Sequence, residues 1–500
     1  DQIDVPDPAS AFQPDDVFGP GEVIDHHAYP WRATDWRGRP WQEAVVLEAH
    51  VGTFTEQGTY RAMIDRLDHL VETGVLWYAP DSAYGRPEDL KALIDAAHQR
   101  GLMMMLDVVY NHFGPEGNYL GRYAPAFFTE AQTPWGSAID YRVEQVRAFA
   151  IENALSWLRE YRFDGLRLDA VNSIVEPGGL SLLHDISAAA GKLAAETGRH
   201  IHLVLENGDN RASILDADED PPQGKYRAQW NDDYHHAWRV LMTGEKQGYY
   251  VDYQRSPISD IARSLASGFV YQGEPSAFRG GRRGEPSGHL APAAFINFLQ
   301  NHDQIGNRAL GDRLESTADP RMIQVALQIL LIAPGIPMLF MGEEWGSKVP
   351  FPFFCDFGGD LADSVRKGRR VELAWANEEY GDEVPDALDR STRDPAVLDW
   401  SERDEPEARK RLTLVRDLLK VRRQQIIPGL AGAGFGEAHA TPDGLLTAHW
   451  RMGDGALLRL VANMSDQTVS HPTGKPAGTL IWGRELGDSI PPWTALWRLG

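Results

Sequence analysis

The chain has 500 residues, of which 42% are apolar and 24% charged, a composition that excludes a disordered or fibrous protein. Acidic residues outnumber Lys and Arg by 72 to 49, so the surface is strongly anionic, and neither nucleic acid nor an anionic membrane is expected as a partner. The single cysteine, Cys355, excludes an internal disulfide framework and is consistent with a reducing, cytoplasmic location.

Residues 1–40 are rich in proline, glycine and aspartate and sustain no hydrophobic period. We interpret them as a linker or the tail of an upstream domain. The first residues show no basic segment followed by an apolar one, so no signal peptide is expected. No run of about 18 apolar residues predicts a transmembrane helix.

Short apolar runs alternate with amphipathic stretches from about residue 43. Apolar residues recur at helical spacing over 63–71, and a second helix is expected between Pro87 and Gly101. Because strands this apolar are typical of parallel sheets covered by helices, the alternation favours a (β/α)8 barrel. A doubly wound open sheet is the alternative, but no G-x-G-x-x-G motif follows the first strand. The predicted strands cover residues 44–47, 102–106, 165–169, 201–206, 228–230, 295–299 and 338–341.

Beyond residue 438 the apolar residues follow a different pattern. Alternating runs at 445–450 and 456–462 predict a small antiparallel β domain. We therefore expect a linker or domain remnant over 1–40, a barrel with insertions over 41–437 and a C-terminal β domain over 438–500.

Ionisable side chains follow four of the predicted strands. In a parallel barrel the carboxyl ends of the strands form one face, where active sites are built. Three carboxylates, Asp169, Glu206 and Asp303, should converge on that face. Two close carboxylates, one ionised as nucleophile and one protonated as acid, are what glycosidic cleavage requires. The other ionisable residues at these strand ends are Asp107, His112, Arg167 and His302.

A structural interpretation of these residues is also open. A single Asp after a strand is more often the N-cap of the next helix than a catalytic group. Helix capping does not readily explain acids at four strand ends. Two of these ends also carry a nearby His, and one has an Arg two residues before the acid. We therefore favour the functional interpretation.

The motifs that contain these residues resemble the conserved regions of the α-amylase superfamily of glycoside hydrolases. Asp-Val-Val-Tyr-Asn-His at 107–112, Gly-Leu-Arg-Leu-Asp at 165–169, Glu206 and Asn-His-Asp at 301–303 match in order and spacing. Within the superfamily the chain resembles the maltooligosyltrehalose trehalohydrolases. That resemblance extends from about residue 5 to the C-terminus and is carried by residues 84–90, 111–119, 229–236, 301–308 and 341–346.

The resemblance implies a role for each residue. Asp169 is the nucleophile, Glu206 the general acid/base, and Asp303 the group that orients the ring hydroxyls and stabilises the transition state. Arg167 is expected to hold Asp169 ionised. No cofactor is implied, and no oxygen-rich loop of EF-hand type suggests the calcium site of many amylases. The residues expected to bind sugar are Asp107, His112, Arg167 and His302, and Phe278 and Arg279 resemble the element that reads the trehalose end.

Three features depart from that family. Most of its N-terminal β-sandwich has no counterpart, since only residues 1–40 precede the barrel. The region of the second barrel strand is abnormally short, and we expect its loop to be absent between 74 and 80 and residues 75–79 to substitute as a strand. Asn172 stands where relatives often have His.

The resemblance predicts an enzyme that cleaves the α-1,4 bond next to the terminal trehalose of maltooligosyltrehalose, with retention of configuration and release of trehalose. Its partners are then maltooligosyltrehalose and related α-glucans. A glucan branching or debranching enzyme is the alternative enzyme, and a catalytically impaired sugar-binding relative is the alternative of another class. Oligomeric state is not predicted.

Overall fold

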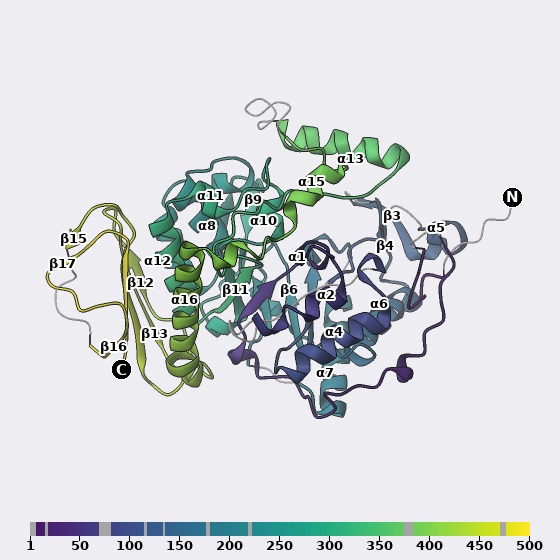
Figure 1. Cartoon of the computed structure of the whole chain (residues 1–500), viewed down its shortest axis with the longest axis horizontal. Coiled ribbons are helices and arrows are strands. Elements are labelled where there is room, and N and C mark those ends of the chain that lie inside the picture. The colour runs from purple at the N-terminus through teal and green to yellow at the C-terminus, as the bar shows by residue number, and fades with distance from the viewer. Residues whose placement is uncertain are drawn as a thin grey trace.

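The structure is a computed structural model that describes residues 7–15, 19–69, 82–114, 118–133, 136–176, 181–218, 223–374, 384–470 and 477–500. Seven strands of these residues form one curled, entirely parallel sheet in the order β1-β11-β10-β7-β6-β5-β2. Helices cover its outer face (Figure 1), so the predicted barrel fold is confirmed. The strands are β1 (Val46–Glu48), β2 (Met105–Val109), β5 (Gly165–Asp169), β6 (His202–Leu205), β7 (Ala228–Trp230), β10 (Phe295–Phe298) and β11 (Ile336–Phe340).

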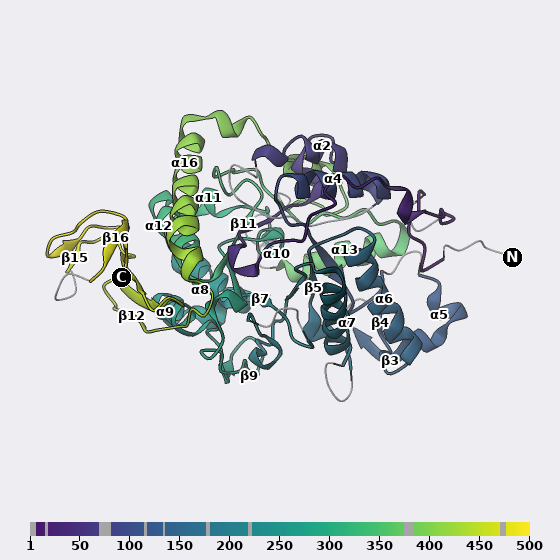
Figure 2. The same cartoon turned by 90° about the horizontal axis from the view of Figure 1, so that it is seen from below.

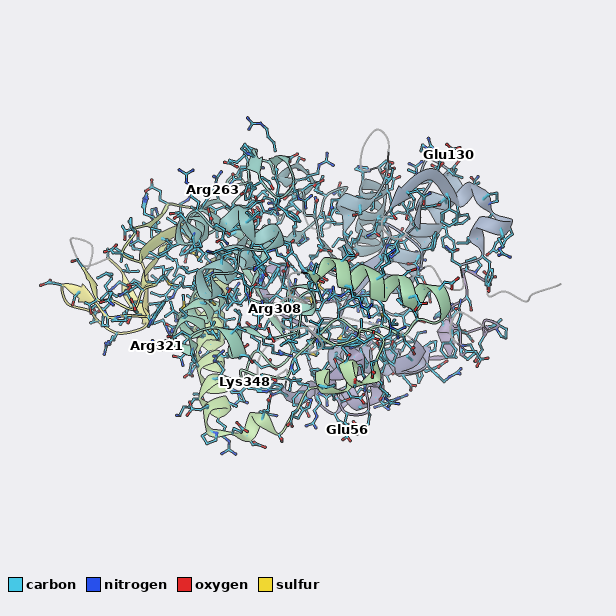
Figure 3. All side chains as sticks on the ribbon, turned by 90° about the horizontal axis from the view of Figure 1, so that it is seen from above. Glu56, Glu130, Arg263, Arg308, Arg321 and Lys348 are labelled. Carbon is cyan, nitrogen blue, oxygen red and sulfur yellow. The ribbon has the colours of Figure 1, made fainter. Side chains whose placement is uncertain are left out.

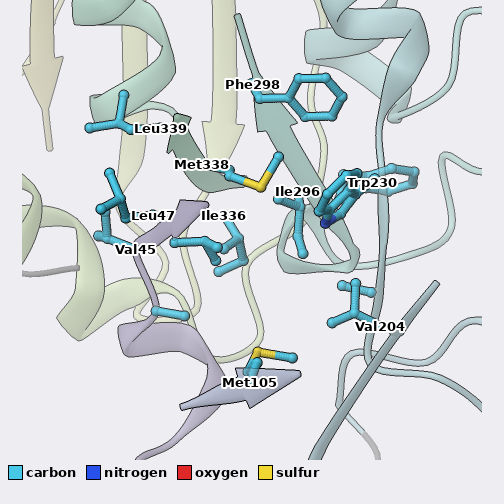
Figure 4. Close-up of a cluster of buried hydrophobic side chains, with 14 of the residues drawn as sticks. Val45, Leu47, Met105, Val204, Trp230, Ile296, Phe298, Ile336, Met338 and Leu339 are labelled. Carbon is cyan, nitrogen blue, oxygen red and sulfur yellow. The ribbon is translucent and has the colours of Figure 1, made fainter. Parts of the chain in front are cut away.

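The barrel core consists of the side chains of these strands. Figure 4 shows Leu47, Met338, Ile296 and Trp230 gathered between the strands, and each is buried. Burial of both faces explains why these strands have continuous apolar sequences instead of alternating ones. Each fully buried side chain of this kind contributes about 1.5–3 kcal/mol relative to an exposed one.

The longer helices follow the strands as the periodicity predicts. In α4 (Pro87–Gln99), Pro87 occupies the first turn and the predicted apolar face of Leu90, Leu93, Ile94 and Ala97 is buried. The other helices are α1 (Val51–Phe54), α2 (Tyr60–Ile64), α5 (Leu120–Tyr123), α6 (Glu144–Arg159), α7 (Ser181–Thr197), α8 (Asp232–Thr243), α9 (Pro257–Ser267), α10 (His302–Gly306), α11 (Leu314–Thr317), α12 (Pro320–Ile332), α13 (Gly359–Glu372), α15 (Arg390–Arg393) and α16 (Pro406–Val421).

Some predicted boundaries differ from the observed ones. Strand β1 begins at Val46 and strand β2 at Met105, later than the apolar runs at 44–47 and 102–106 suggest. Residues 44, 45, 102 and 103 are buried but unpaired, because apolarity reports burial, whereas backbone pairing sets the strand ends. The predicted strand at 75–79 lies outside the described residues. Among the described strands, β1 and β2 occupy the two ends of the sheet order.

The segment before the barrel packs along its outer surface. The Trp36 indole donates a hydrogen bond to Asp164 at 2.8 Å, and its ring stacks on His98 at 5.0 Å. The backbone N–H groups of Arg32 and Ala33 donate to Asp95 of α4. Residues 31–36 are therefore anchored to the barrel by buried carboxylates.

The C-terminal part forms a separate five-stranded antiparallel sheet, as predicted, in the order β12-β13-β14-β18-β16. It lies at one end of the molecule beyond α16, opposite the N-terminus (Figures 1 and 2). Two tryptophans attach it to the barrel helices: Trp450 donates to the carbonyl of Leu265 at 2.8 Å, and Trp482 donates to Gln328 at 2.9 Å. Its strands are β12 (Ala438–Ala440), β13 (Leu445–Arg451), β14 (Leu457–Asn463), β16 (Thr479–Trp482) and β18 (Thr494–Leu499).

Three short two-stranded ribbons complete the described secondary structure. None of the helices in the described part of the chain is both long and apolar enough to cross a bilayer. The ribbons pair β3 (Phe128–Thr133) with β4 (Gly136–Ile139), β8 (Glu274–Ser276) with β9 (Gly281–Arg283), and β15 (Val469–Ser470) with β17 (Ser489–Ile490).

Candidate active site

One buried guanidinium organises the carboxyl face of the barrel. Arg167 of β5 is 1% exposed, and its Nη1 lies 2.7 Å from Asp107 and 2.8 Å from Asp169. Its Nη2 lies 2.7 Å from Glu206, which follows β6. The guanidinium carbon sits 4.0 Å above the centre of the Trp230 ring. A single cation from β5 therefore holds together carboxylates from β2, from β5 and from the segment after β6.

The turn after β5 brings the two central carboxylates close to one another. Ala170, next to Asp169, has the left-handed backbone angle φ of 39°, which is uncommon for a residue with a Cβ. This turn aims the Ala170 N–H at Glu206, to which it donates at 2.9 Å. Backbone strain of this kind persists where the surroundings hold it in place, and it often accompanies function.

Burial changes the protonation of this carboxylate cluster. Burial raises the pKa of Asp169, Arg167 lowers it, and Glu206 raises it again, with a net increase above the ordinary value. Burial likewise raises the pKa of Asp107 to about 7, against the lowering effect of Arg167. Arg167 therefore favours ionised Asp169, as the sequence predicts, but it does not outweigh the cost of desolvation.

His302 is fixed by a carboxylate that the sequence analysis did not single out. Its backbone N–H donates to Glu48 Oε2 at 3.0 Å, and its ring Nδ1 contacts the other oxygen of the same carboxylate. Burial lowers the pKa of His302, but Glu48 and Asp303 raise it to about 10. Glu48 is the last residue of a buried strand, as Asp169 is, so the same signal could have identified it.

Two more acids belong to this face of the barrel: Asp303, which the sequence predicts, and Asp232, which it does not. Asp303 Oδ1 lies 3.6 Å from His302 Nε2, and its side chain is largely open to solvent. Asp232 begins α8 after β7, and burial together with Glu206 raises its pKa to about 7, while Arg283 lowers it. The acid pair at 232–233 directly after a predicted strand was the available signal for Asp232.

His112 borders the cluster on the β2 side. Burial lowers its pKa while Asp169 raises it, so the ring lies near that carboxylate, and its Nδ1 contacts the Asn111 side chain. The Asn111 amide also lies 3.4 Å from Asp169 Oδ2. His112 therefore lies beside the carboxylate cluster.

Two cavities open at the strand ends. One of about 390 Å³ is lined by Glu48, Asp107, His302 and Asp303, with an aromatic wall of Phe340, Phe351, Phe353 and Phe354. The other, of about 280 Å³, lies over β5 and β6 and is lined by Asn172, Asn207 and Asp209 among others. A cavity with aromatic walls and a few convergent polar groups is typical of a small-molecule site.

Phe278 and Arg279 lie on a ribbon beside the second cavity. Arg279 pairs with Asp209 at 3.0 Å, and the Phe278 ring is 53% exposed, with its centre 6.0 Å from that of Tyr249. The neighbouring Arg283 is buried and pairs with Asp233 at 2.9 Å. Arg283 is therefore part of the folded core of this region, whereas Arg279 is partly exposed.

The arrangement is suited to carboxylate chemistry. Within the described residues, no group of three or more His, Cys, Asp or Glu is arranged to hold a metal ion. Three carboxyl groups contact one guanidinium, and two of them, those of Asp169 and Glu206, could serve as the nucleophile and the acid of a double-displacement hydrolysis.

Comparison with known proteins gives a consistent assignment. The family described as "Alpha amylase, catalytic domain" matches residues 77–133, and a domain of unknown function, DUF3459, matches residues 433–497. A malto-oligosyltrehalose trehalohydrolase of Deinococcus radiodurans is 39% identical over 449 residues, covering 85% of this chain and 73% of that protein.

A solved structure and a more distant relative complete the comparison. The crystal structure of a putative alpha amylase from Salmonella typhimurium superposes with a TM-score of 0.92 at 42% identity, covering 99% of this chain and 88% of that one. A 1,4-alpha-glucan branching enzyme of Mycobacterium bovis is 33% identical, but only over 29% of this chain. The similarity to trehalohydrolases thus extends over far more of the chain than the similarity to that branching enzyme.

Proposed function

The chain belongs to the malto-oligosyltrehalose trehalohydrolase family, and from this premise we propose that it cleaves the α-1,4 bond next to the terminal trehalose of maltooligosyltrehalose and releases trehalose. The observation that carries the proposal is the contact of one guanidinium, that of Arg167, with both Asp169 and Glu206. This contact keeps the two carboxyl groups close, as the retaining mechanism requires.

Each carboxyl group has one task in this mechanism. Glu206 in its protonated form gives its proton to the glycosidic oxygen, while ionised Asp169 attacks the anomeric carbon. The C–O bond to trehalose breaks as the bond to Asp169 forms. Glu206, now ionised, takes a proton from water, which attacks the same carbon, so that Asp169 leaves and configuration is retained.

The remaining site residues position the sugar. Asp303 accepts hydrogen bonds from ring hydroxyls, and His112 and His302 contact the glucose at the cleavage point. Protonated His302, held by Glu48, supplies a charged donor that stabilises negative charge nearby. Phe278 and Arg279 contact the trehalose end, which is supported by the pairing of Arg279 with Asp209, three residues after Glu206.

The experiment is incubation with maltotriosyltrehalose and quantification of free trehalose. Asp169→Asn and Glu206→Gln should each reduce turnover by about three orders of magnitude or more, because each removes a group that reacts covalently or transfers a proton. Asp399→Asn, at an exposed turn, is the matched control and should retain wild-type turnover. A change in branch content of amylose without trehalose release would indicate a branching enzyme instead. Binding without turnover would indicate the sugar-binding relative.

The proposal also covers the domain division and the cellular location. We propose that the chain divides into a linker at 1–40, a barrel at 41–437 and a β domain at 438–500. The separation of the two large sheets supports this division. A cytoplasmic location is proposed from the single cysteine, Cys355.

A further inference from the structure

A third cavity adjoins the active site on the side of β10 and β11. Its volume is about 500 Å³, within the range of small-molecule sites. Pro352 and Phe353 line both this cavity and the one that contains His302 and Asp303. Helix α13 forms its other wall. Figure 3 labels Arg308, which also lines this cavity. The cavity therefore extends the active-site cleft.

Carboxylates pair with three of the arginines that line this extension, Arg308, Arg366 and Arg369. Arg308 lies 2.9 Å from Asp312 and also contacts Glu245. Arg366 pairs with Asp386 at 2.8 Å, and Arg369 pairs with Glu372 at 2.8 Å. Guanidinium groups neutralised in this way attract anions weakly. Such pairs still offer donors and acceptors side by side, which matches the hydroxyl groups of a neutral sugar.

Phe353 provides an apolar surface at the junction. Its side chain is 41% exposed, unusual for a Phe ring, and the guanidinium of Arg369 lies 4.9 Å from the ring centre. Arg369 also lies 3.3 Å from the carbonyl of Gly306, so the stack is attached to the backbone that carries Asp303. A fixed, exposed ring can pack against the C–H face of a pyranose.

The position of Glu206 indicates which part of the substrate enters this cavity. The acid must lie on the side of the leaving group, and Glu206 adjoins the opposite cavity through Asn207 and Asp209. Trehalose, the leaving group, therefore belongs on the β5–β6 side. The glucan chain that becomes attached to Asp169 extends away from it, toward Phe353.

We propose that the cavity between Phe353 and α13 binds the second and third glucose units of the glucan chain, counted from the scissile bond. The proposal rests on the proposed function, since it assumes this substrate. Phe353 supplies the stacking surface, and the paired arginines Arg366 and Arg369 supply hydrogen bonds. The cavity thus sets the preference of the enzyme for chain length.

The test compares kcat/KM for glucosyl-, maltosyl- and maltotriosyltrehalose. In the wild-type enzyme kcat/KM should rise with chain length. Phe353→Ala should lower kcat/KM about tenfold more for the two longer substrates than for glucosyltrehalose, which corresponds to loss of one stacking contact. Phe353→Tyr should restore the dependence. Val371→Ala, at a 72% exposed position of α13, is the matched control and should behave as wild type.

The outcomes separate the two proposals. If the wild-type enzyme releases no trehalose, the proposed function fails. If it releases trehalose but Phe353→Ala affects all three substrates equally, or none, the cavity is not a glucan subsite. Inhibition by inorganic phosphate that Arg366→Ala abolishes would show an anion site in its place and overturn the proposal.

Discussion

Replacing Arg167 by Met tests the central feature of the site. The substitution keeps an unbranched apolar stem but removes the guanidinium, which leaves Asp107, Asp169 and Glu206 without their shared cation. Removing one partner from a buried ion pair costs about 3–5 kcal/mol of unfolding free energy. The larger effect should be on ionisation, because Asp169 must be charged to attack.

The magnitude follows from the geometry of the pair. Opposite charges about 4 Å apart at an effective dielectric constant near 20 attract by about 4 kcal/mol, or about three pKa units. Asp169 is 26% exposed, so solvent screening reduces this, and we expect an increase of about one to two units. Since burial already raises the pKa of Asp169, removal of Arg167 should raise it further.

The assay is the pH profile of kcat/KM for trehalose release, whose acidic limb reports the ionisation of the free enzyme. In Arg167→Met the acidic limb should move to higher pH by about one to two units. Arg167→Lys retains the charge and should keep the limb near its wild-type position with a reduced rate.

Arg422→Met is the matched control. Arg422 is equally buried but donates to the carbonyls of Ala333 and Gly335, each at 2.7 Å. This variant should lose stability without moving the limb. An unmoved acidic limb in Arg167→Met would refute the argument that Arg167 favours ionised Asp169.

Three further outcomes are expected. Glu48 raises the pKa of His302 to about 10, so this pair stabilises the fold below about pH 6.5, and the stabilisation is lost as the pH rises through 10. The melting temperature of Glu48→Gln should therefore differ most from wild type near pH 6 and least above pH 10, and a constant difference would contradict the pairing. Asp164 is buried, which raises its pKa, but His98 holds the pKa below its ordinary value. The ionised Asp164 side chain stabilises the fold above about pH 4, and this stabilisation is lost as the pH falls further. Asp164→Asn should therefore lower the free energy of unfolding by about 3–5 kcal/mol at neutral pH, measured by denaturant titration. A loss below about 1 kcal/mol would contradict this expectation. EDTA should change neither trehalose release nor melting temperature, and a loss restored by calcium would contradict this expectation.

The barrel strands were predictable because their signal is local. Strands β5 and β7 have the bounds that their apolar runs suggest, since those runs are short and end in polar residues. The start of β2 was not predictable in this way. Residues 102–104 are as apolar and as buried as the strand itself, and only the ladder with β5 decides where pairing begins.

The sequence predicted which residues form the site better than it predicted the contacts between them. Asp169, Glu206 and Asp303 were found because each follows an apolar strand, and parallel strands end on one face. Glu48, the last residue of β1, and Asp232, after β7, were missed as site residues, although residues 229–236 are among those that carry the family resemblance. The contact between Glu48 and His302 joins residues 254 positions apart in the chain.

The sequence by itself determined the fold class, the order of the strand-end residues and the chemistry that they can perform. These follow from hydrophobic patterns and residue types, which act over a few neighbouring positions. Only the tertiary structure decided that one guanidinium serves three carboxylates, that burial outweighs it at Asp169, and that Glu48 charges His302. Such effects depend on distances through space and on exclusion of water, and both are set by strands that lie far apart in the chain.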